Sequence, residues 1–234
     1  MGQAFLEVRD LHAWYGESHV LHGVNFDVHE GEVLTLLGRN GAGRTSTLRA
    51  IMGLIGRRTG SIVVRGAQTI ALATHGIARL GLGYCPEERG IFSSLSTEEN
   101  LLLPPVLQSG GMSLDDIYAL FPNLQERAQS QGTRLSGGEQ QMLALARILR
   151  SGARLLLLDE ISEGLAPVIV QKLAETVKLL RARGYTVLMV EQNFRFAAPL
   201  ADRFLVMEHG SIEHSFTQAE LPQKRKQLRA LLGV

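Results

Sequence analysis

Residues 38–46 carry the clearest chemical pattern of the chain, Gly-Arg-Asn-Gly-Ala-Gly-Arg-Thr-Ser. The spacing is typical of a phosphate-binding loop, whose backbone N–H groups surround a phosphate. We expect Gly38 and Gly43 to adopt backbone conformations that a Cβ would forbid. The candidate nucleotide-binding residues are Gly38, Arg39, Asn40, Gly41, Ala42, Gly43, Arg44, Thr45 and Ser46. Because Arg44 stands where this motif has lysine, a glycine-rich turn without a ligand is the alternative.

The segments on either side of this loop have the secondary structure that the motif requires. The apolar run 33–37 predicts a buried strand. A helical pattern follows, with Leu48, Ile51, Met52 and Ile55 on one side. The N-terminus of a helix adds its own attraction for phosphate. The pattern therefore points to a bound nucleoside triphosphate, with Thr45 placed to ligate Mg²⁺.

A second pattern is the acidic pair Asp159-Glu160, which follows four leucines at 155–158. An apolar strand that ends in aspartate is the usual partner of a phosphate-binding loop, so we expect Asp159 to hold Mg²⁺, through water, beside Thr45. Glu160 comes at the carboxyl end of the strand, where it could orient or deprotonate the water that attacks a γ-phosphate. The alternative is an acidic pair that opens a surface loop.

A third pattern, Leu-Ser-Gly-Gly-Glu-Gln-Gln at 135–141, precedes an apolar-periodic helix over 142–149. Ser136 could cap that helix, and its hydroxyl and the neighbouring amides could also bind phosphate. As a cap alone the motif is unremarkable. In this order, with Ser136 23 residues before Asp159, the motif is a much more specific signal than a helix cap.

Composition limits the class of protein. The 234 residues are enough for one substantial core, and 45% hydrophobic residues indicate a globular fold. A net charge of +1 gives no strong attraction for nucleic acid. The single cysteine, Cys85, excludes an internal disulfide. We see no signal peptide, and the apolar runs are too short to span a bilayer, so any work at a membrane is expected from the cytoplasmic face through a partner.

The remaining chain reads as alternating strands and helices. Strands are expected at 5–8, 24–28, 61–64, 155–158 and 186–190, and a helix at about 167–183. Residues 93–130 read as helical segments broken by prolines and glycines. The basic run 224–229 is interpreted as a solvated helix face.

In this order, the three patterns resemble the ATP-binding subunits of ABC transporters, whose signature motif is Leu-Ser-Gly-Gly-Glu-Gln. The resemblance covers essentially the full length. It implies an α/β fold, a P-loop NTPase (ABC ATPase) core with an antiparallel β subdomain and a helical subdomain. We expect one ATP-binding domain over 4–234, with the β-rich and nucleotide-binding core at about 4–92 and 150–234 and the helical subdomain at about 93–149.

Four stretches resemble one group more closely, the shorter ATPase subunit of high-affinity branched-chain amino acid importers. They are residues 38–43, 86–92, 163–167 and 190–193. The resemblance implies a membrane-associated ATPase that uses ATP and Mg²⁺, on the cytoplasmic face of the bacterial inner membrane. Its partners would be a second ATPase subunit, identical or a sister chain, two membrane permease subunits and, indirectly, a periplasmic binding protein.

The resemblance also assigns roles to single residues. Ser136, Gly137 and Gly138 would act in trans on the ATP held by the other subunit. Tyr15 matches the aromatic residue that stacks on adenine, with a core or edge-strand aromatic as the alternative. Ile91, Phe92 and the region 93–130 match the face that contacts the membrane subunits.

The chain departs from the broad family pattern at several positions. Arg44 replaces lysine and keeps its charge, but the planar guanidinium is bulkier. Glu87 stands where a glutamine helps to coordinate Mg²⁺. Gln192 stands where a histidine contacts the γ-phosphate, and Ala166 where an aspartate bridges the dimer. Ile161-Ser162 replaces Pro-Thr, which frees the backbone beside Glu160.

Three hypotheses about function follow. The first is an ATPase that powers uptake of branched-chain amino acids, or of another amino acid, an amide or urea. The second, motivated by Arg44, is a nucleotide-binding subunit with weak or no hydrolysis. The third, a soluble ABC ATPase that works on DNA or ribosomes, is disfavoured because the chain has no long coiled-coil insertion or tandem cassette.

Overall fold

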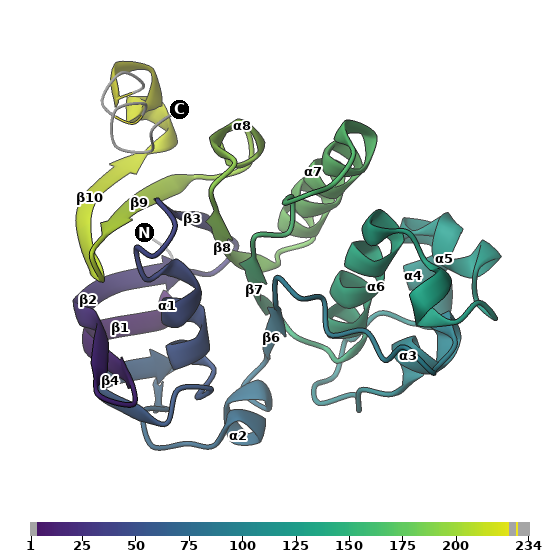
Figure 1. The fold of residues 1–234 in the computed structure, drawn as a ribbon, viewed down its shortest axis with the longest axis horizontal. Helices are drawn as coiled ribbons and strands as arrows, with labels where there is room; N and C mark the ends of the chain where they lie inside the picture. Colours follow the sequence, from purple (N-terminus) through teal and green to yellow (C-terminus); the bar gives the residue numbers. More distant parts are fainter. Residues whose placement is uncertain (1–3, 225–227, 229–234) are drawn as a thin grey trace.

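The computed structural model describes residues 4–224 and 228, which form two β-sheets with helices around them (Figure 1). The smaller sheet is antiparallel, with the strand order β2-β1-β4-β5. Its strands are β1 (Ala4–Tyr15), β2 (Ser18–His29), β4 (Arg57–Val64) and β5 (Ala67–Gln68). Most of the predicted basic run at 224–229 lies outside the described residues.

The β1–β2 hairpin is much longer than the strands predicted at 5–8 and 24–28, because both strands have 12 residues. The pairing register shifts at several points, among them between Val8 and Leu11. Such bulges interrupt the regular alternation of apolar and polar residues on which the prediction relied. The turn-proximal half also exposes aromatic and histidine side chains, and the rings of Trp14 and His19 stack with centroids 4.3 Å apart.

The larger sheet has six strands in the order β10-β9-β3-β8-β7-β6. Five are parallel to one another, and β10 pairs antiparallel at one edge. The strands are β3 (Val33–Gly38), β6 (Leu82–Cys85), β7 (Leu155–Asp159), β8 (Thr186–Glu191), β9 (Arg203–Glu208) and β10 (Ser211–Thr217). The predicted strands at 33–37, 155–158 and 186–190 are confirmed, whereas β6, β9 and β10 were not predicted.

Both faces of the larger sheet are buried, which explains the uninterrupted leucine run of β7. Leu155 and Leu157 face a core shared with α1 and the antiparallel sheet, whereas Leu156 and Leu158 face a core shared with α6 and α7. A strand covered on both sides needs apolar residues at every position rather than at alternate ones. The same alternation between the two cores runs along β3 and β8.

The helices divide into two groups (Figure 1). One group adjoins the strands of the larger sheet: α1 (Arg44–Ile51), α2 (Thr74–Ala78), α7 (Pro167–Ala182) and α8 (Phe194–Ala197). The other group gathers beyond the β6 edge of that sheet: α3 (Thr97–Leu102), α4 (Leu114–Leu120), α5 (Pro122–Glu126) and α6 (Gly137–Arg150). Of these helices, α6 also packs against β6 and joins the group to the sheet. Short 3₁₀ helices lie at Gly132–Arg134 and Gln218–Glu220. None of the described helices combines the length and the apolar composition that a membrane-spanning segment needs.

Serine capping boxes begin three helices of the second group, at Ser96, Ser113 and Ser136. The Ser136 hydroxyl accepts a hydrogen bond from the backbone N–H of Glu139, whose carboxylate accepts one from the backbone N–H of Ser136. The predicted cap at Ser136 is therefore confirmed. The helix begins at Gly137, directly after this cap, and contains the apolar-periodic stretch 142–149.

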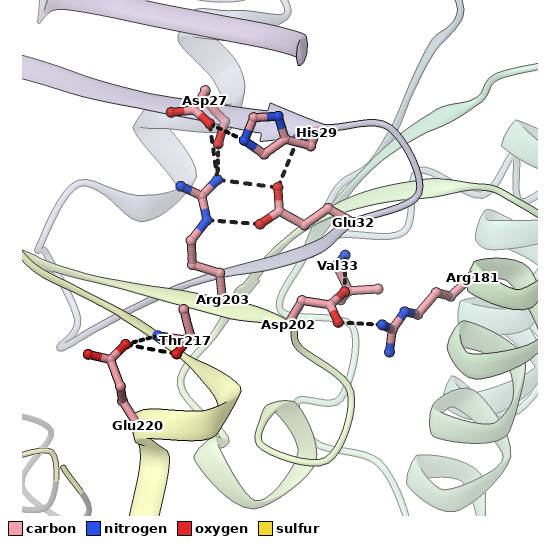
Figure 2. Close-up of polar contacts among 9 residues, drawn as sticks. All are labelled: Asp27, His29, Glu32, Val33, Arg181, Asp202, Arg203, Thr217 and Glu220. Carbon is pink, nitrogen blue, oxygen red and sulfur yellow. Dashed lines mark hydrogen bonds and ion pairs between the residues drawn. The ribbon is translucent and has the colours of Figure 1, made fainter. Parts of the chain in front are cut away.

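A polar network joins β2, β3 and β9 at the edge of the larger sheet where β3 begins (Figure 2). Arg203 donates to Glu32 at 2.8 Å and also pairs with Asp27, which in turn contacts His29 at 2.8 Å. Next to it, the Asp202 carboxylate accepts a hydrogen bond from the backbone N–H of Val33 at 2.9 Å. These bonds fix where β3 starts, and therefore where the loop after β3 lies.

Another buried contact joins the segment that follows β7 to the last residue of β8. The Glu191 carboxylate accepts hydrogen bonds from the backbone N–H of Ser162 at 3.2 Å and from its hydroxyl at 2.8 Å. Both residues are buried. Burial raises the pKa of Glu191 to about 8, and the neighbouring charge of Glu160 acts in the same direction, whereas the bonds from Ser162 oppose the shift.

This pKa predicts a pH-dependent stability that Glu191→Gln removes. The folded state favours the protonated acid, so the stabilisation is complete below the ordinary pKa and is lost as pH rises through the folded pKa. Relative to wild type, Glu191→Gln should become more stable between about pH 5.5 and about pH 8.5, by about 3 kcal/mol.

Urea unfolding at several pH values measures this difference. Glu175→Gln, on the exposed side of α7, is the matched control and should show no such trend. A difference between wild type and Glu191→Gln that stays constant with pH would contradict the prediction.

Candidate functional site

The loop between β3 and α1 has the shape expected of a phosphate-binding loop, with one correction. Gly43 has a φ of +105°, a conformation that favours glycine, and α1 begins directly after it. Gly38 has no such φ, so the prediction of an unusual backbone conformation there is wrong. Glycine is required at this position because a Cβ would lie 2.5 Å from the carbonyl oxygen of Met207 in β9.

A cavity of about 630 Å³ opens over this loop. It is lined by seven of the nine predicted loop residues, 40–46, and by Glu87 and Glu160. Gly38 lies at the end of β3, and Arg39 is exposed. The cavity therefore joins the loop after β3 to residues that follow β6 and β7, at the carboxyl edge of the sheet, where ligands bind in such folds.

Asp159 is fully buried and holds the base of the cavity together. One carboxylate oxygen accepts a hydrogen bond from the Thr45 hydroxyl at 2.9 Å, and the other accepts one from the Tyr84 hydroxyl at 2.9 Å. Burial raises the pKa of Asp159, and these two hydrogen bonds oppose the shift. The sequence predicted that Thr45 and Asp159 meet, and they do.

The donor set fits Mg²⁺. A hydroxyl and a carboxylate are the hard oxygen ligands that this ion prefers, and Mg²⁺ usually takes one or two protein oxygens and completes its shell with water and phosphate. Within the described residues, no group of three or more His, Cys, Asp or Glu side chains could hold a metal ion. Thr45 and Asp159 would therefore hold the ion together with the oxygens of a bound phosphate.

Arg44 and Glu160 form a buried ion pair. Nη2 of Arg44 lies 2.7 Å from Oε1 of Glu160, and the two side chains are 4% and 10% exposed. The same nitrogen also contacts Oδ1 of Asn40 at 3.2 Å. The residue that replaces the lysine of the motif thus reaches from the loop to the acidic residue after β7.

Glu160 has an unusual environment for a carboxylate. Its φ of +48° is rare for any residue other than glycine, and such conformations gather at functional sites. Burial raises the pKa of Glu160 to about 7, helped by a hydrogen bond with Glu163 and by the charge of Glu87, and the charge of Arg44 opposes the shift. A carboxylate with a pKa in this range can act as a general base near neutral pH.

Other predicted site residues lie outside this cavity. Gln192 is exposed and lines a second cavity of about 760 Å³, together with Glu160, Glu163 and Glu191. Tyr15, at the end of β1, is 43% exposed and lines neither cavity. Ser136, Gly137 and Gly138 stand at the start of α6 and also line neither.

The sequence did not indicate several residues that the structure brings to the site. Tyr84 comes from the short strand β6 and reaches Asp159, and Glu163 reaches Glu160. His19 and His22, from β2, line the wall of the first cavity. Glu163 opens the stretch 163–167 quoted for the family resemblance, but that stretch assigned it no role at the site. The others belong to no local motif, and only the pairing of β6 with β7 could have indicated Tyr84.

Comparison with known proteins identifies the architecture that carries this site. The ABC transporter family matches residues 21–163. The high-affinity branched-chain amino acid transport ATP-binding protein BraG of Pseudomonas aeruginosa is 41% identical, over 94% of this chain and 96% of its own length. The lipopolysaccharide export system ATP-binding protein LptB of Escherichia coli is 32% identical, over 98% of each chain.

A solved structure of the ATP-binding subunit of an ABC transporter has a TM-score of 0.79 and 29% identity, and the match covers 98% of this chain and 95% of that one. The fold, the loop that meets Asp159 and Glu160, and these similarities agree with one another. The chain belongs to the ATP-binding subunits of the ABC transporter family and is an ATPase coupled to transport.

Proposed function

We propose that this subunit powers the uptake of branched-chain amino acids from the cytoplasmic face of the bacterial inner membrane, through separate membrane subunits. The observation that carries the choice of substrate is the similarity to BraG, which at 41% identity exceeds the 32% found with the exporter subunit LptB. Uptake of another amino acid, an amide or urea is the nearest alternative. Specificity would reside in the periplasmic binding protein and the membrane subunits.

The cavity over the loop is the proposed ATP site. The N–H groups of 40–46 and the charge of Arg44 would hold the phosphates, while Thr45 and Asp159, with Glu87 at the rim, would hold Mg²⁺. Glu160 would take the proton of the attacking water. Tyr15 would stack on adenine, and Gln192 would donate a hydrogen bond to the γ-phosphate.

A second ATPase subunit would complete the site. The signature residues Ser136 to Gly138 line neither cavity of their own chain, which supports a role in trans on the nucleotide of a partner. Since the Ser136 hydroxyl accepts the capping bond from Glu139, its hydrogen is still available for a phosphate oxygen. The partner is either a second copy of this chain or a sister subunit.

The proposed contact with the membrane subunits is an apolar surface around α3. Four large side chains there are exposed: Phe92, Leu102, Leu103 and Val106. Asn100 fixes the preceding loop to α3, because its side chain accepts from the backbone N–H of Phe92 at 2.9 Å and donates to the Phe92 carbonyl at 3.0 Å. Exposed apolar surface of this kind marks a site of protein contact.

Glu160→Gln should stop turnover without stopping nucleotide binding. An amide cannot accept the proton of the attacking water, so the ATPase rate of the assembled complex should fall by about a hundredfold or more. Equilibrium binding of ATP should be kept or strengthened. Glu175→Gln serves as the control for loss of a carboxylate, and an unchanged rate in Glu160→Gln would remove Glu160 from the role of base.

Reconstitution with the membrane subunits tests the proposed substrate. In proteoliposomes that contain the complete complex, the binding protein loaded with leucine, isoleucine or valine should stimulate ATP hydrolysis and drive uptake of the labelled amino acid. Asp159→Asn should abolish both. Stimulation by an amide, by urea or by lipopolysaccharide, without any by branched-chain amino acids, would replace the proposed substrate.

The alternative function is a subunit that holds ATP but hydrolyses it weakly, and the Arg44–Glu160 pair is the observation that favours it. We expect Arg44→Lys to leave the rate of the assembled complex within about threefold of wild type, because both cations can pair with the β- and γ-phosphates. Steady-state phosphate release measures this. A rise of about a hundredfold in Arg44→Lys would favour the nucleotide-holding function.

A further inference from the structure

The side chain of Arg44 crosses the phosphate-binding loop. Its Cδ passes so close to Gly38 that a Cβ on that glycine would lie 3.4 Å away. Its Nη2 then lies between the loop residue Asn40, at 3.2 Å, and Glu160, at 2.7 Å. The guanidinium therefore lies over the loop and points toward the acidic residue after β7.

This position leaves the guanidinium only partly satisfied. Nη1 is buried and has no hydrogen-bond partner among the described residues. A guanidinium is charged at every physiological pH and has five N–H donors, and a buried donor without an acceptor destabilises its conformation. Phosphate oxygens are the acceptors that this planar group matches best. Nη2 thus holds Glu160, while Nη1 remains a donor that a phosphate oxygen could satisfy.

We propose that the Arg44–Glu160 ion pair regulates the site, because the phosphates of an incoming nucleotide compete with Glu160 for the guanidinium. Without nucleotide, Arg44 holds the carboxylate of Glu160 and keeps it from a water molecule. When phosphate oxygens enter, Arg44 turns to them and Glu160 is released. Arg44 is in this sense a positioning residue for Glu160. The inference rests on the proposed function, since it assumes that residues 38–46 bind nucleotide phosphates.

Two ways in which Arg44 could act, competition and electrostatic screening, predict opposite signs for the coupling between Arg44 and Glu160 in nucleotide affinity. If nucleotide binding must break the pair, neutralising Glu160 strengthens binding more when Arg44 is present than when it is absent. If Arg44 instead kept both partners, it would screen the repulsion between Glu160 and the phosphates. Neutralising Glu160 would then strengthen binding less when Arg44 is present.

A double-mutant cycle with Arg44→Met and Glu160→Gln distinguishes these cases. The measured quantity is the affinity for a fluorescent ADP analogue in the absence of Mg²⁺. A diphosphate without the metal ion ensures that neither hydrolysis nor metal binding contributes to the measured affinity. We expect Glu160→Gln to tighten binding by about tenfold in the wild-type background and by less than about threefold in the Arg44→Met background. An equal or smaller gain in the wild-type background would overturn the proposal.

The matched control is the cycle of Arg39→Met with Glu160→Gln, because Arg39 is a cation of the same loop that is exposed. It should show no coupling. Circular dichroism and thermal unfolding check that each variant folds. If Arg44→Met does not fold, the neutral Arg44→Gln replaces it, and a gain there as large as in the wild-type background would overturn the proposal.

The outcomes also separate this inference from the proposed function. Wild type that binds nucleotide and hydrolyses ATP, but shows no positive coupling, refutes the regulatory pair alone. Wild type that binds no nucleotide refutes the ATP site and the inference together.

Discussion

The contact between the loop after β3 and the end of β7 is the interaction on which the candidate site depends. Two bonds make it, from Thr45 to Asp159 at 2.9 Å and from Arg44 to Glu160 at 2.7 Å. The two strands are not neighbours, because β8 lies between them. The contact therefore requires that all three strands run parallel and end at the same edge of the sheet, as the register of β3 with β8 and of β8 with β7 ensures.

That order depends on burial of both faces of the sheet. The side chains of β3, β7 and β8 alternate between two cores, so a shift of any strand by one residue would exchange the two sets of apolar residues. Polar contacts fix the two ends of the strands. Asp202 and the Arg203 network fix the start of β3 (Figure 2). At the other end, Ser162, which follows β7, bonds to Glu191, the last residue of β8. The buried side chains of Arg44, Asp159 and Glu160 thus follow strands whose register is fixed by these contacts.

Local patterns in the sequence predicted the parts of this arrangement that local chemistry determines. The consecutive apolar residues of β3, β7 and β8 suit a strand that is buried on both faces. The cap at Ser136 depends only on Glu139, three positions further along the chain. The meeting of Thr45 with Asp159 was predictable because the loop and the acidic strand end occur together in one known arrangement.

Contacts between distant segments were not predictable in the same way. The extent of the β1–β2 hairpin depends on bulges, and the need for glycine at 38 depends on a carbonyl of β9. Tyr84 reaches Asp159 only because the short strand β6 pairs with β7. The Arg44–Glu160 pair joins residues 116 positions apart. The sequence shows that arginine replaces lysine at position 44, but it does not show which residue the arginine contacts. The long, planar guanidinium can reach acceptors that lysine would not, so the usual contacts of the motif's lysine do not identify its partner.

The position of α6 indicates how two chains could share what one chain separates. The phosphate-binding loop lies between the two sheets, whereas Ser136 begins a helix of the group beyond the β6 edge of the larger sheet (Figure 1). The proposed ATP site and the signature residues thus lie on different parts of one chain. If the loop of one copy faces the signature residues of a second copy, a twofold axis brings the remaining loop and signature together as well, so such an assembly closes with two identical sites. A subunit whose Glu160 is held by its own Arg44 would then have two requirements for turnover, a nucleotide that draws Arg44 away and a partner that covers the nucleotide.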